Sequence, residues 1–540
     1  MDRAIKRLKA KKVLVFERGE EEYERSVATS NLLFRFSRPE CVMQPTTFSQ
    51  VQDIIKQAKS QKLEITIKGG GHSYAGHSTA FRGISLDLSK LNTAKLDIKS
   101  KSVTIQAGCQ WGNVYKTLVN GQHDGFVVNG GRCPTVGVGG FTLGGGLGPF
   151  TRSIGMGSDT LTEATLVTAD GNLVTVKDSD DPNSNKGRLF WAIRGGGGGN
   201  FGVLVEMKLQ VRRLRNKDGI VIAGRYQWFP KSGMTDDFMT TMNSFYTTSW
   251  PNRMTIDSTW MCDLRGRSSA DGVRFLIYYD GTKEEFDVVI DEYIKNLELS
   301  KQLKRRSLPE KSTRFLHETL VSQWTEETKK AFPSNNTYSI YSSFIFKNDR
   351  ITIERATSII REDMEAFRRR FSGEQVEFLV TWIHSGGKAT EKKPSDTAFF
   401  WREAVYHTYV TVEWVDKWME TDMRPFLEDV KKKLRPLSLK GEAAFINFPD
   451  GALGANAHER AYFGDNRQEL RRVKKMWDKD NFFKSAQGVG LPKSAENDGG
   501  SGVNRPNEED LTHTIAGEHW KYFGTKNFKK ELNELVELGL

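Results

Sequence analysis

The sequence has few cysteines, no long apolar run and no export signal at its start. Only four of the 540 residues are cysteine, and the spacing of Cys41, Cys109, Cys133 and Cys262 fits neither a disulfide framework nor a zinc site. No run reaches the roughly eighteen apolar residues that a membrane span needs, so we expect none. The basic start, residues 1–7, lacks the apolar core of a signal peptide. These absences favour a reducing, cytoplasmic compartment and no metal site. A secreted protein whose leader has been removed stays open as the alternative.

Acidic residues are outnumbered by basic ones, 68 against 79, which gives a formal charge of +11. A basic surface attracts nucleic acid, membrane headgroups or anionic ligands. The basic residues are spread along the chain, however, and the clusters at 6–12, 301–306 and 431–435 are typical of solvated faces or helix ends. No nucleic-acid-binding motif occurs. We therefore expect no nucleic-acid partner, and the sequence leaves the oligomeric state open.

Glycine is abundant, and it gathers in two segments about sixty residues apart, 67–74 and 131–148. Glycine permits positive φ and lets backbone amides approach a ligand closely, and successive amides form concave sites for anionic oxygens. Each segment also carries a nucleophilic side chain, His72 in the first and Cys133 in the second. The pattern favours a large phosphorylated cofactor that could be held covalently. The alternative is that these are plain tight turns with packed side chains.

The two segments resemble the flavin-binding loops of the berberine bridge enzyme family, within the vanillyl-alcohol oxidase or p-cresol methylhydroxylase (PCMH)-type FAD proteins. The family's first loop reads Arg/Lys-x-Gly-Gly-His-Ser/Asp-Tyr, matched by residues 68–74, and its second reads Gly-x-Cys-x-Thr-Val-Gly-x-Gly-Gly, matched by 131–140. Residues 189–202 and 461–483 resemble two further family segments. The resemblance implies a bicovalent FAD, bonded by His72 at the 8α-methyl carbon and by Cys133 at C6.

The resemblance also implies which residues contact the cofactor. Most belong to the two loops, and the others lie in the segments near 159, 200 and 464. The implied set is Lys68, Gly69, Gly70, Gly71, His72, Ser73, His77, Ser78, Cys133, Thr135, Val136, Gly137, Gly139, Gly140, Gly144, Gly148, Asp159, Gly199, Asn200, Gly202, Val203, Tyr462 and Asn466.

Residues 197–202 also fit the GxGxxG fingerprint of Rossmann folds. That fingerprint requires a helix after it and an acidic residue about twenty positions on. A β-branched, strand-like run follows here, residues 203–211, and no acid lies near position 222. We therefore reject the Rossmann interpretation.

Periodicity and composition predict an α+β protein. Residues 51–58 form an apolar helical stripe that Thr47 can cap, and 63–67, 84–88 and 103–107 are predicted strands. After 213 glycine becomes scarce and aromatics increase, with strands predicted at 274–279, 377–383 and 404–414 and a helix at 353–369. With the resemblance, we expect a two-subdomain PCMH-type FAD-binding domain and an antiparallel-sheet substrate domain with helices on one side.

The predicted boundaries are as follows. The FAD-binding domain covers residues 1–212, with its core at about 37–212, and the substrate-binding domain covers 213–440. Residues 441–493 return to the first domain. A linker and tail at 494–540 include a short helical stripe of Phe528, Leu532 and Leu535.

The catalytic base is the main departure from the family pattern. Several members place a Tyr base in the motif Asn-Tyr-x-Asp, but residues 447–450 carry Phe448 there, which cannot accept a proton. Either another residue is the base, or the substrate is an amine that needs none, or the site binds without oxidising. His407 and Tyr409 are our candidates, since they share one face of a strand that resembles the family's pocket-lining strand. Satisfied sheet residues are the alternative, and His384 is a weaker candidate.

The resemblance implies an FAD-dependent oxidase. It would transfer a hydride from a small organic substrate, such as an alcohol, an amine or a specialised metabolite, to flavin N5 and then to O2, giving H2O2. Within the family, Val three residues after the bonding Cys favours O2 as acceptor, and Val136 has that position. The alternatives are a dehydrogenase with another acceptor, and a non-redox cyclase or ligand-binding protein of the same fold.

Overall fold

The computed structural model describes residues 1–492 apart from 232, 267–269, 331, 333–334 and 455. The expected linker and the expected tail helix with Phe528 lie outside these residues. None of the helices in the described ranges combines the length and the apolarity that crossing a bilayer requires.

Residues 2–87 form a small sheet covered by helices. Its strand order is β1-β2-β4-β3, with β1 antiparallel and the other pairs parallel. The predicted helix is α3, whose buried stripe includes Val51, Ile54 and Ile55, and Thr47 caps it by accepting a hydrogen bond from the amide of Gln50 at 3.2 Å. The elements are α1 (Asp2–Ala10), β1 (Leu14–Glu17), α2 (Glu21–Val27), β2 (Cys41–Gln44), α3 (Phe48–Ser60), β3 (Ile65–Lys68) and β4 (Ile84–Asp87).

A second, antiparallel sheet follows, with the order β5-β6-β10-β8-β9. The hairpin between β8 and β9 turns at Asp170-Gly171, where Gly171 has φ +73°. Strand β10 follows residues 197–202 directly, so the rejection of a Rossmann fingerprint is confirmed. The elements are β5 (Ala94–Asp97), β6 (Ser102–Gln106), α4 (Trp111–Asn120), β7 (Phe126–Val127), α5 (Val138–Leu143), α6 (Thr151–Ile154), β8 (Leu161–Val167), β9 (Leu173–Lys177), α7 (Asn185–Ala192), β10 (Val203–Gln210) and β11 (Arg212–Arg213).

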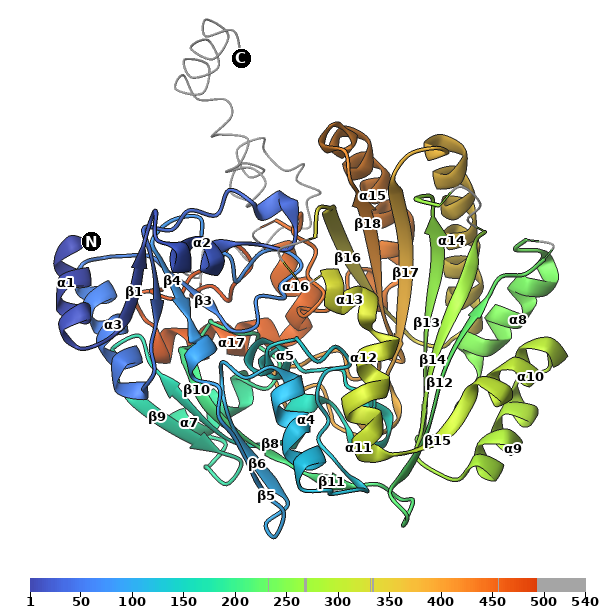
Figure 1. Cartoon of the computed structure of the whole chain (residues 1–540), viewed down its shortest axis with the longest axis horizontal. Helices are drawn as coiled ribbons and strands as arrows, with labels where there is room; N and C mark the ends of the chain where they lie inside the picture. Colours follow the sequence, from blue (N-terminus) through green and yellow to red (C-terminus); the bar gives the residue numbers. More distant parts are fainter. Residues whose placement is uncertain (232, 267–269, 331, 333–334, 455, 493–540) are drawn as a thin grey trace, which may run out of the picture.

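The third sheet is fully antiparallel, with the order β15-β12-β14-β13-β17-β18-β16. Helices α8, α9, α10, α14 and α15 pack on one face of it and close an aromatic-rich core (Figure 1). The strands are β12 (Ile220–Trp228), β13 (Met254–Asp263), β14 (Gly272–Tyr279), β15 (Ser307–Lys311), β16 (Tyr338–Phe346), β17 (Val376–His384) and β18 (Tyr406–Trp414). The helices are α8 (Asp236–Thr247), α9 (Lys283–Tyr293), α10 (Leu297–Arg306), α11 (Ser312–Arg314), α12 (Leu320–Gln323), α13 (Thr325–Lys330), α14 (Arg350–Phe371) and α15 (Glu420–Leu434).

The last described segment packs against the first two sheets. Its helices are α16 (Ala457–Phe463) and α17 (Arg467–Trp477), and α17 contacts α7. The pattern at 461–477 predicts one helix, but Gly464, with φ +50°, separates two. Leu470, Val473 and Phe483 belong to the core of the first two sheets. The predicted α+β class, with antiparallel sheets and helices on one side of the largest, is confirmed.

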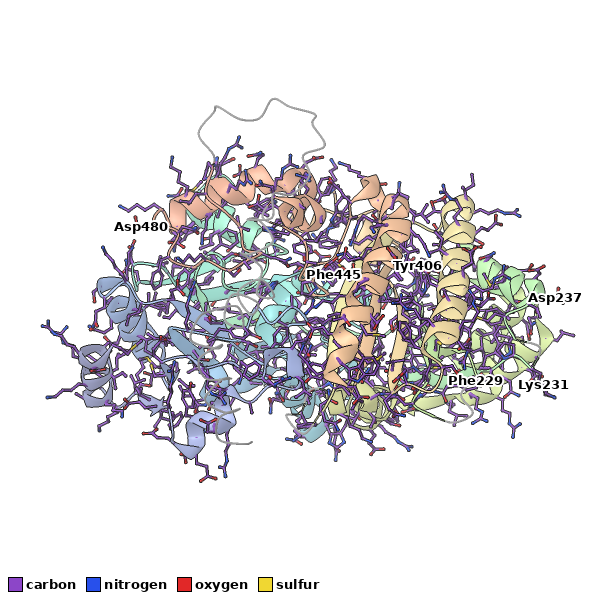
Figure 2. All side chains as sticks on the ribbon, turned by 90° about the horizontal axis from the view of Figure 1, so that it is seen from above. Phe229, Lys231, Asp237, Tyr406, Phe445 and Asp480 are labelled. Atoms are coloured by element: carbon purple, nitrogen blue, oxygen red, sulfur yellow. The ribbon has the colours of Figure 1, made fainter. Side chains whose placement is uncertain are left out.

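The large sheet is buried on both faces. Along β18, Tyr406, Val410 and Val412 pack into the core under the helices, whereas Tyr409 packs with the core of the first two sheets. Figure 2 accordingly has Tyr406 nearer the covering helices and Phe445 on the side of the first two sheets. The odd-numbered face of β18 therefore looks toward the glycine segments.

Candidate active site

A cavity of about 900 Å³ lies between the large sheet and the glycine segments. This volume is at the upper end of the range for small-molecule sites, roughly 300–1,000 Å³. Its wall combines both glycine segments with residues 25–31, 197–200, 446–449 and 482–487, and with side chains of α13, β16, β17 and β18.

The two glycine segments touch each other through their backbones. A Cβ built on Gly70 would lie 2.3 Å from the amide nitrogen of Gly137, and one on Gly137 would lie 2.4 Å from that of Gly70. Only glycine at both positions permits this approach. The contact brings His72 and Cys133 to the wall of one cavity.

The His72 imidazole is uncharged at neutral pH. Burial lowers its pKa to about 4, and a hydrogen bond with the Thr135 backbone acts in the opposite direction. A neutral imidazole keeps a nitrogen lone pair, which is the form that can bond to carbon.

The Cys133 side chain is buried beside two hydroxyls. Its Sγ lies 3.2 Å from Oγ1 of Thr135 and 3.4 Å from Oγ1 of Thr328, on α13. The preceding residue, Arg132, forms a buried two-point ion pair with Asp257 of β13. The loop is thereby fixed to the large sheet on one side of Cys133 and to α13 on the other.

Most of the predicted cofactor contacts line this cavity. They come from the first segment, from the second segment and from the turn before β10. Those that line it are Lys68, Gly69, Gly70, Gly71, His72, Ser73, His77, Ser78, Cys133, Val136, Gly137, Gly139, Gly140, Gly199, Asn200 and Gly202.

Seven predicted contacts lie behind the wall and support it. Gly144 meets the amide of Asn447, and Gly148 packs on Asn129 and Gly130. Asp159 pairs with the buried Arg402, with oxygen–nitrogen distances of 2.8 and 2.9 Å. Of the other four, Thr135 lies beside Cys133, and Val203 is the first residue of β10. The Tyr462 hydroxyl donates to Gln487, and the Asn466 side chain donates to three carbonyls of residues 394–398.

The two candidate bases have different surroundings. Tyr409 lines the cavity, and its ring lies 4.5 Å from that of Phe448 and 5.9 Å from that of Tyr74. His407 is buried between Phe399 and Phe445, with Nδ1 2.9 Å from the Ser385 hydroxyl, and does not line the cavity. Its pKa falls to about 3, mainly because of burial.

Four aromatic side chains form what we call the aromatic wall: Tyr74, Tyr341, Tyr409 and Phe448. Tyr74 stacks on Tyr341 with ring centres 4.1 Å apart and nearly parallel planes. Burial raises the pKa of each tyrosine, so the three phenols are neutral at neutral pH. Tyr341 was not predicted as a site residue, and only its alternation along a strand could have indicated it.

Two charged residues of α13, Glu327 and Lys330, also line the cavity and were not predicted. The sequence of α13, Thr-Glu-Glu-Thr-Lys-Lys, is typical of a solvated helix, so no pattern indicates that part of it faces inward. The Nζ of Lys330 lies 3.2 Å from both Glu377 and Glu413, which are buried, and Arg265 contacts the same two carboxylates.

The residues present fit a flavin dinucleotide. Backbone without Cβ atoms at Gly139, Gly140 and Gly199 leaves room for close approach, and a Cβ on Gly140 would meet nothing within 4 Å. The buried hydroxyl of Ser78 lines the cavity and has no hydrogen-bond partner among the described residues. A polar ligand in the cavity would satisfy it.

Comparisons with known proteins agree with this site. The family model described as "FAD binding domain" matches residues 39–177, and the model "Berberine and berberine like" matches residues 444–490. The first match contains both glycine segments, and the second contains Phe448 and the segments that close the cavity. Both matched regions therefore contribute to the wall.

Curated relatives match along most of the chain. An uncharacterised FAD-linked oxidoreductase, YvdP of Bacillus subtilis, is 27% identical over 443 residues, which are 81% of this chain and 89% of that protein. A tetrahydroberberine oxidase of Argemone mexicana is 24% identical over 480 residues, 84% of this chain and 83% of that protein.

Solved structures show the same fold. Berberine bridge enzyme from Eschscholzia californica superposes with a TM-score of 0.76 at 19% identity, over 91% of this chain and 99% of that one. A chitooligosaccharide oxidase gives a TM-score of 0.74 at 21% identity, over 91% and 100%. At such identities the likeness concerns the fold alone. The two family models and the curated relatives, together with this fold, support the assignment of the chain as an FAD-linked oxidoreductase similar to the berberine bridge enzyme family.

Proposed function

We propose that the chain is an oxidase that holds FAD through two covalent bonds, to His72 and Cys133, and passes electrons from a small organic substrate to O2. The observation that carries the proposal is the Gly70–Gly137 contact, which brings the two nucleophilic side chains to the wall of one cavity. The neutral His72 and the buried Cys133 suit attachment to carbon. When bound, the flavin supplies hydride acceptance and reoxidation by O2.

The choice of O2 rests on Val136. This residue is three positions after Cys133 and lines the cavity. The family pattern associates a small side chain at this position with access of O2, and a bulkier one with other acceptors. A dehydrogenase is the competing function.

The substrate end of the cavity is the aromatic wall, because two of its residues, Tyr341 of β16 and Tyr409 of β18, lie on the large sheet, which faces the glycine segments across the cavity. We propose that Tyr409 orients the substrate there through its phenol. Burial raises the pKa of Tyr409, and the nearby Glu327 adds to the rise, so the phenol stays protonated at neutral pH. It is then a hydrogen-bonding group rather than a strong base. Since Phe448 cannot accept a proton and His407 does not line the cavity, a substrate that needs no strong base suits the site best.

Acid precipitation of the purified protein tests the attachment. We expect a yellow pellet from the native chain and flavin in the supernatant from a His72→Ala, Cys133→Ala double variant. Cys109→Ala is the matched control, because Cys109 is a buried thiol that does not line the cavity. A yellow pellet from the double variant would contradict the assignment.

Oxygen consumption separates the two acceptors. Once a substrate has bleached the flavin without air, admission of O2 should restore the absorbance and yield one H2O2 per substrate. Recovery with a dye but not with O2 would establish the dehydrogenase instead. A Val136→Leu variant should reoxidise more slowly in O2 while keeping its rate with the dye.

A further inference from the structure

We propose that the aromatic wall binds a ligand that carries a positively charged amino group, with the Glu327 carboxylate as its counter-charge. This inference rests on the proposed function, which assigns that end of the cavity to the substrate. It adds the substrate's chemical class and the residue that recognises it.

Glu327 differs from the other charged side chains that line the cavity. Those side chains have partners: Arg25 pairs with Glu21, Lys68 donates to the carbonyl of Ser26, Glu64 pairs with Arg82 and Lys484, Arg132 pairs with Asp257, and Lys330 pairs with Glu377 and Glu413. For Glu327 the described residues provide neither an ion pair nor a hydrogen bond. A half-buried carboxylate without a partner is costly, so a cationic ligand beside it is favoured.

The aromatic wall supplies the rest of a cation site. Tyr74, Tyr341 and Tyr409 are neutral, so they add ring faces and hydroxyls but no charge. The negative charge of Glu327 contributes to the raised pKa of all three phenols, whereas Lys330 opposes the rise of the pKa at Tyr341 and Tyr409, so both charges of α13 face this end of the cavity. Ring faces attract ammonium groups, and more strongly where water is excluded.

The positive charge of Lys330 does not make this end of the cavity electropositive. Its ammonium is 3.2 Å from each of two buried carboxylates, so its charge is compensated. On the other side of α13, Glu326 pairs with Arg274 and Arg225. The ion pairs of this region join four cations to four carboxylates, and Glu327 lies outside that balanced network: Lys330, Arg265, Arg274 and Arg225 with Asp263, Glu326, Glu377 and Glu413.

Binding of choline, compared with its uncharged isostere 3,3-dimethylbutan-1-ol, tests the proposal. The two differ by one quaternary nitrogen in place of carbon, so their affinity ratio measures recognition of charge. We expect the purified holoprotein, titrated without air by calorimetry, to bind choline at least about tenfold more tightly than the alcohol. Glu327→Gln should remove most of that ratio.

Glu326→Gln is the matched control. It makes the same change one residue away, on a carboxylate that does not line this cavity. It should keep the native preference for choline. Glu327→Gln should keep the thermal midpoint and the flavin spectrum of the parent, which excludes a folding defect as the cause. Glu326→Gln should keep the flavin spectrum but lower the thermal midpoint, because it removes the ion pair with the buried Arg274.

The outcomes separate the two proposals. A yellow protein that binds both probes equally, or that keeps its choline preference in Glu327→Gln, would overturn the cation site and leave the oxidase assignment standing. A protein without covalent flavin that still prefers choline through Glu327 would overturn the oxidase assignment alone. Tighter binding of an anion such as benzoate would reverse the sign of the site and refute the inference.

Discussion

At the scale of single residues, the pair Gly70 and Gly137 is the constraint that joins the two glycine segments. Each would place a Cβ within 2.4 Å of the other's backbone nitrogen, and backbone cannot move aside as a side chain can. The glycine-rich pattern predicts that the backbone approaches a ligand closely. In the structure, these two glycines instead allow the backbone of one loop to contact the backbone of the other.

Replacing Gly70 by Ala should separate the two segments. We expect a loss of about 1–3 kcal/mol in the free energy of unfolding, as for other overpacked sites, and a lower flavin content after purification. Urea unfolding and the ratio of visible to ultraviolet absorbance measure the two effects. Gly454→Ala is the control, because a Cβ there meets nothing within 4 Å. Full flavin content in Gly70→Ala would show that the contact is dispensable.

His407 makes the stability depend on pH. Its pKa falls from an ordinary 6.5 to about 3 in the folded chain, mainly through burial, so the unfolded chain binds the proton more readily. Stability is therefore full above pH 6.5 and is lost as the pH falls toward 3, by about 1.4 kcal/mol per pH unit.

A His407→Phe variant should lose this dependence. Between pH 7 and pH 5 we expect its free energy of unfolding to fall by about 2 kcal/mol less than that of the native chain. At pH 7 the variant should itself lose about 1 kcal/mol, because the hydrogen bond to Ser385 is gone. Urea unfolding at both pH values provides the comparison. Parallel pH profiles would mean that His407 titrates normally.

At the scale of elements, the sequence predicts those parts of the site that are formed by turns, helices and strands close together in the chain. The glycine segments, the helix after Thr47 and the strands before and after each loop follow from turn chemistry and periodicity. Phe448 was identified as a departure from a motif, and it lies in the wall.

The sequence does not predict which sides of β18 and α13 face the cavity. Alternation along β18 divides its residues between two faces, but helices cover one face and the first two sheets cover the other. Both faces therefore carry buried residues, and the pattern cannot distinguish them. Helix α13 has the composition of a surface helix. Glu327 faces the cavity because α13 packs beside Cys133 and because Lys330 of the same helix pairs with the buried Glu377 and Glu413.

The ion pair between Arg132 and Asp257 joins two elements, the second glycine segment and β13. Asp257→Ala leaves a buried guanidinium without its counter-charge and removes the acceptor for the amide of His384. We expect a loss of about 3–5 kcal/mol in the free energy of unfolding, measured in urea. Glu17→Ala, which breaks the exposed pair with Lys9, should cost less than about 1 kcal/mol. Equal losses would show that the buried pair contributes no more than a surface one.

At the scale of the whole molecule, the two ends of the described chain meet around one cavity. Residues 446–449 and 482–487 complete a cavity that residues 25–140 begin, and the large sheet between them in sequence forms its roof. Lys474 of α17 is fully buried, and its ammonium contacts Asp478 and the carbonyls of Asn200 and Phe483. It thereby links the last described segment to the turn before β10.

A Lys474→Met variant should weaken this closure. Asp478 would lose its cation, and the two carbonyls would lose their hydrogen-bond donor. We therefore expect the free energy of unfolding to fall by about 3 kcal/mol or more. In a His72→Ala, Cys133→Ala background, we also expect faster release of non-covalent flavin. Lys475→Met changes an exposed neighbour and should alter stability by less than about 0.5 kcal/mol. Equal stability of the two variants would contradict the role of Lys474.

Mass spectrometry of the denatured, protease-digested chain tests the central proposal most directly. We predict that the peptides containing His72 and Cys133 are recovered joined through a single flavin, with neither present in unmodified form. Recovery of both peptides unmodified, with all FAD released on denaturation, would contradict the bicovalent attachment on which the proposed oxidase function depends.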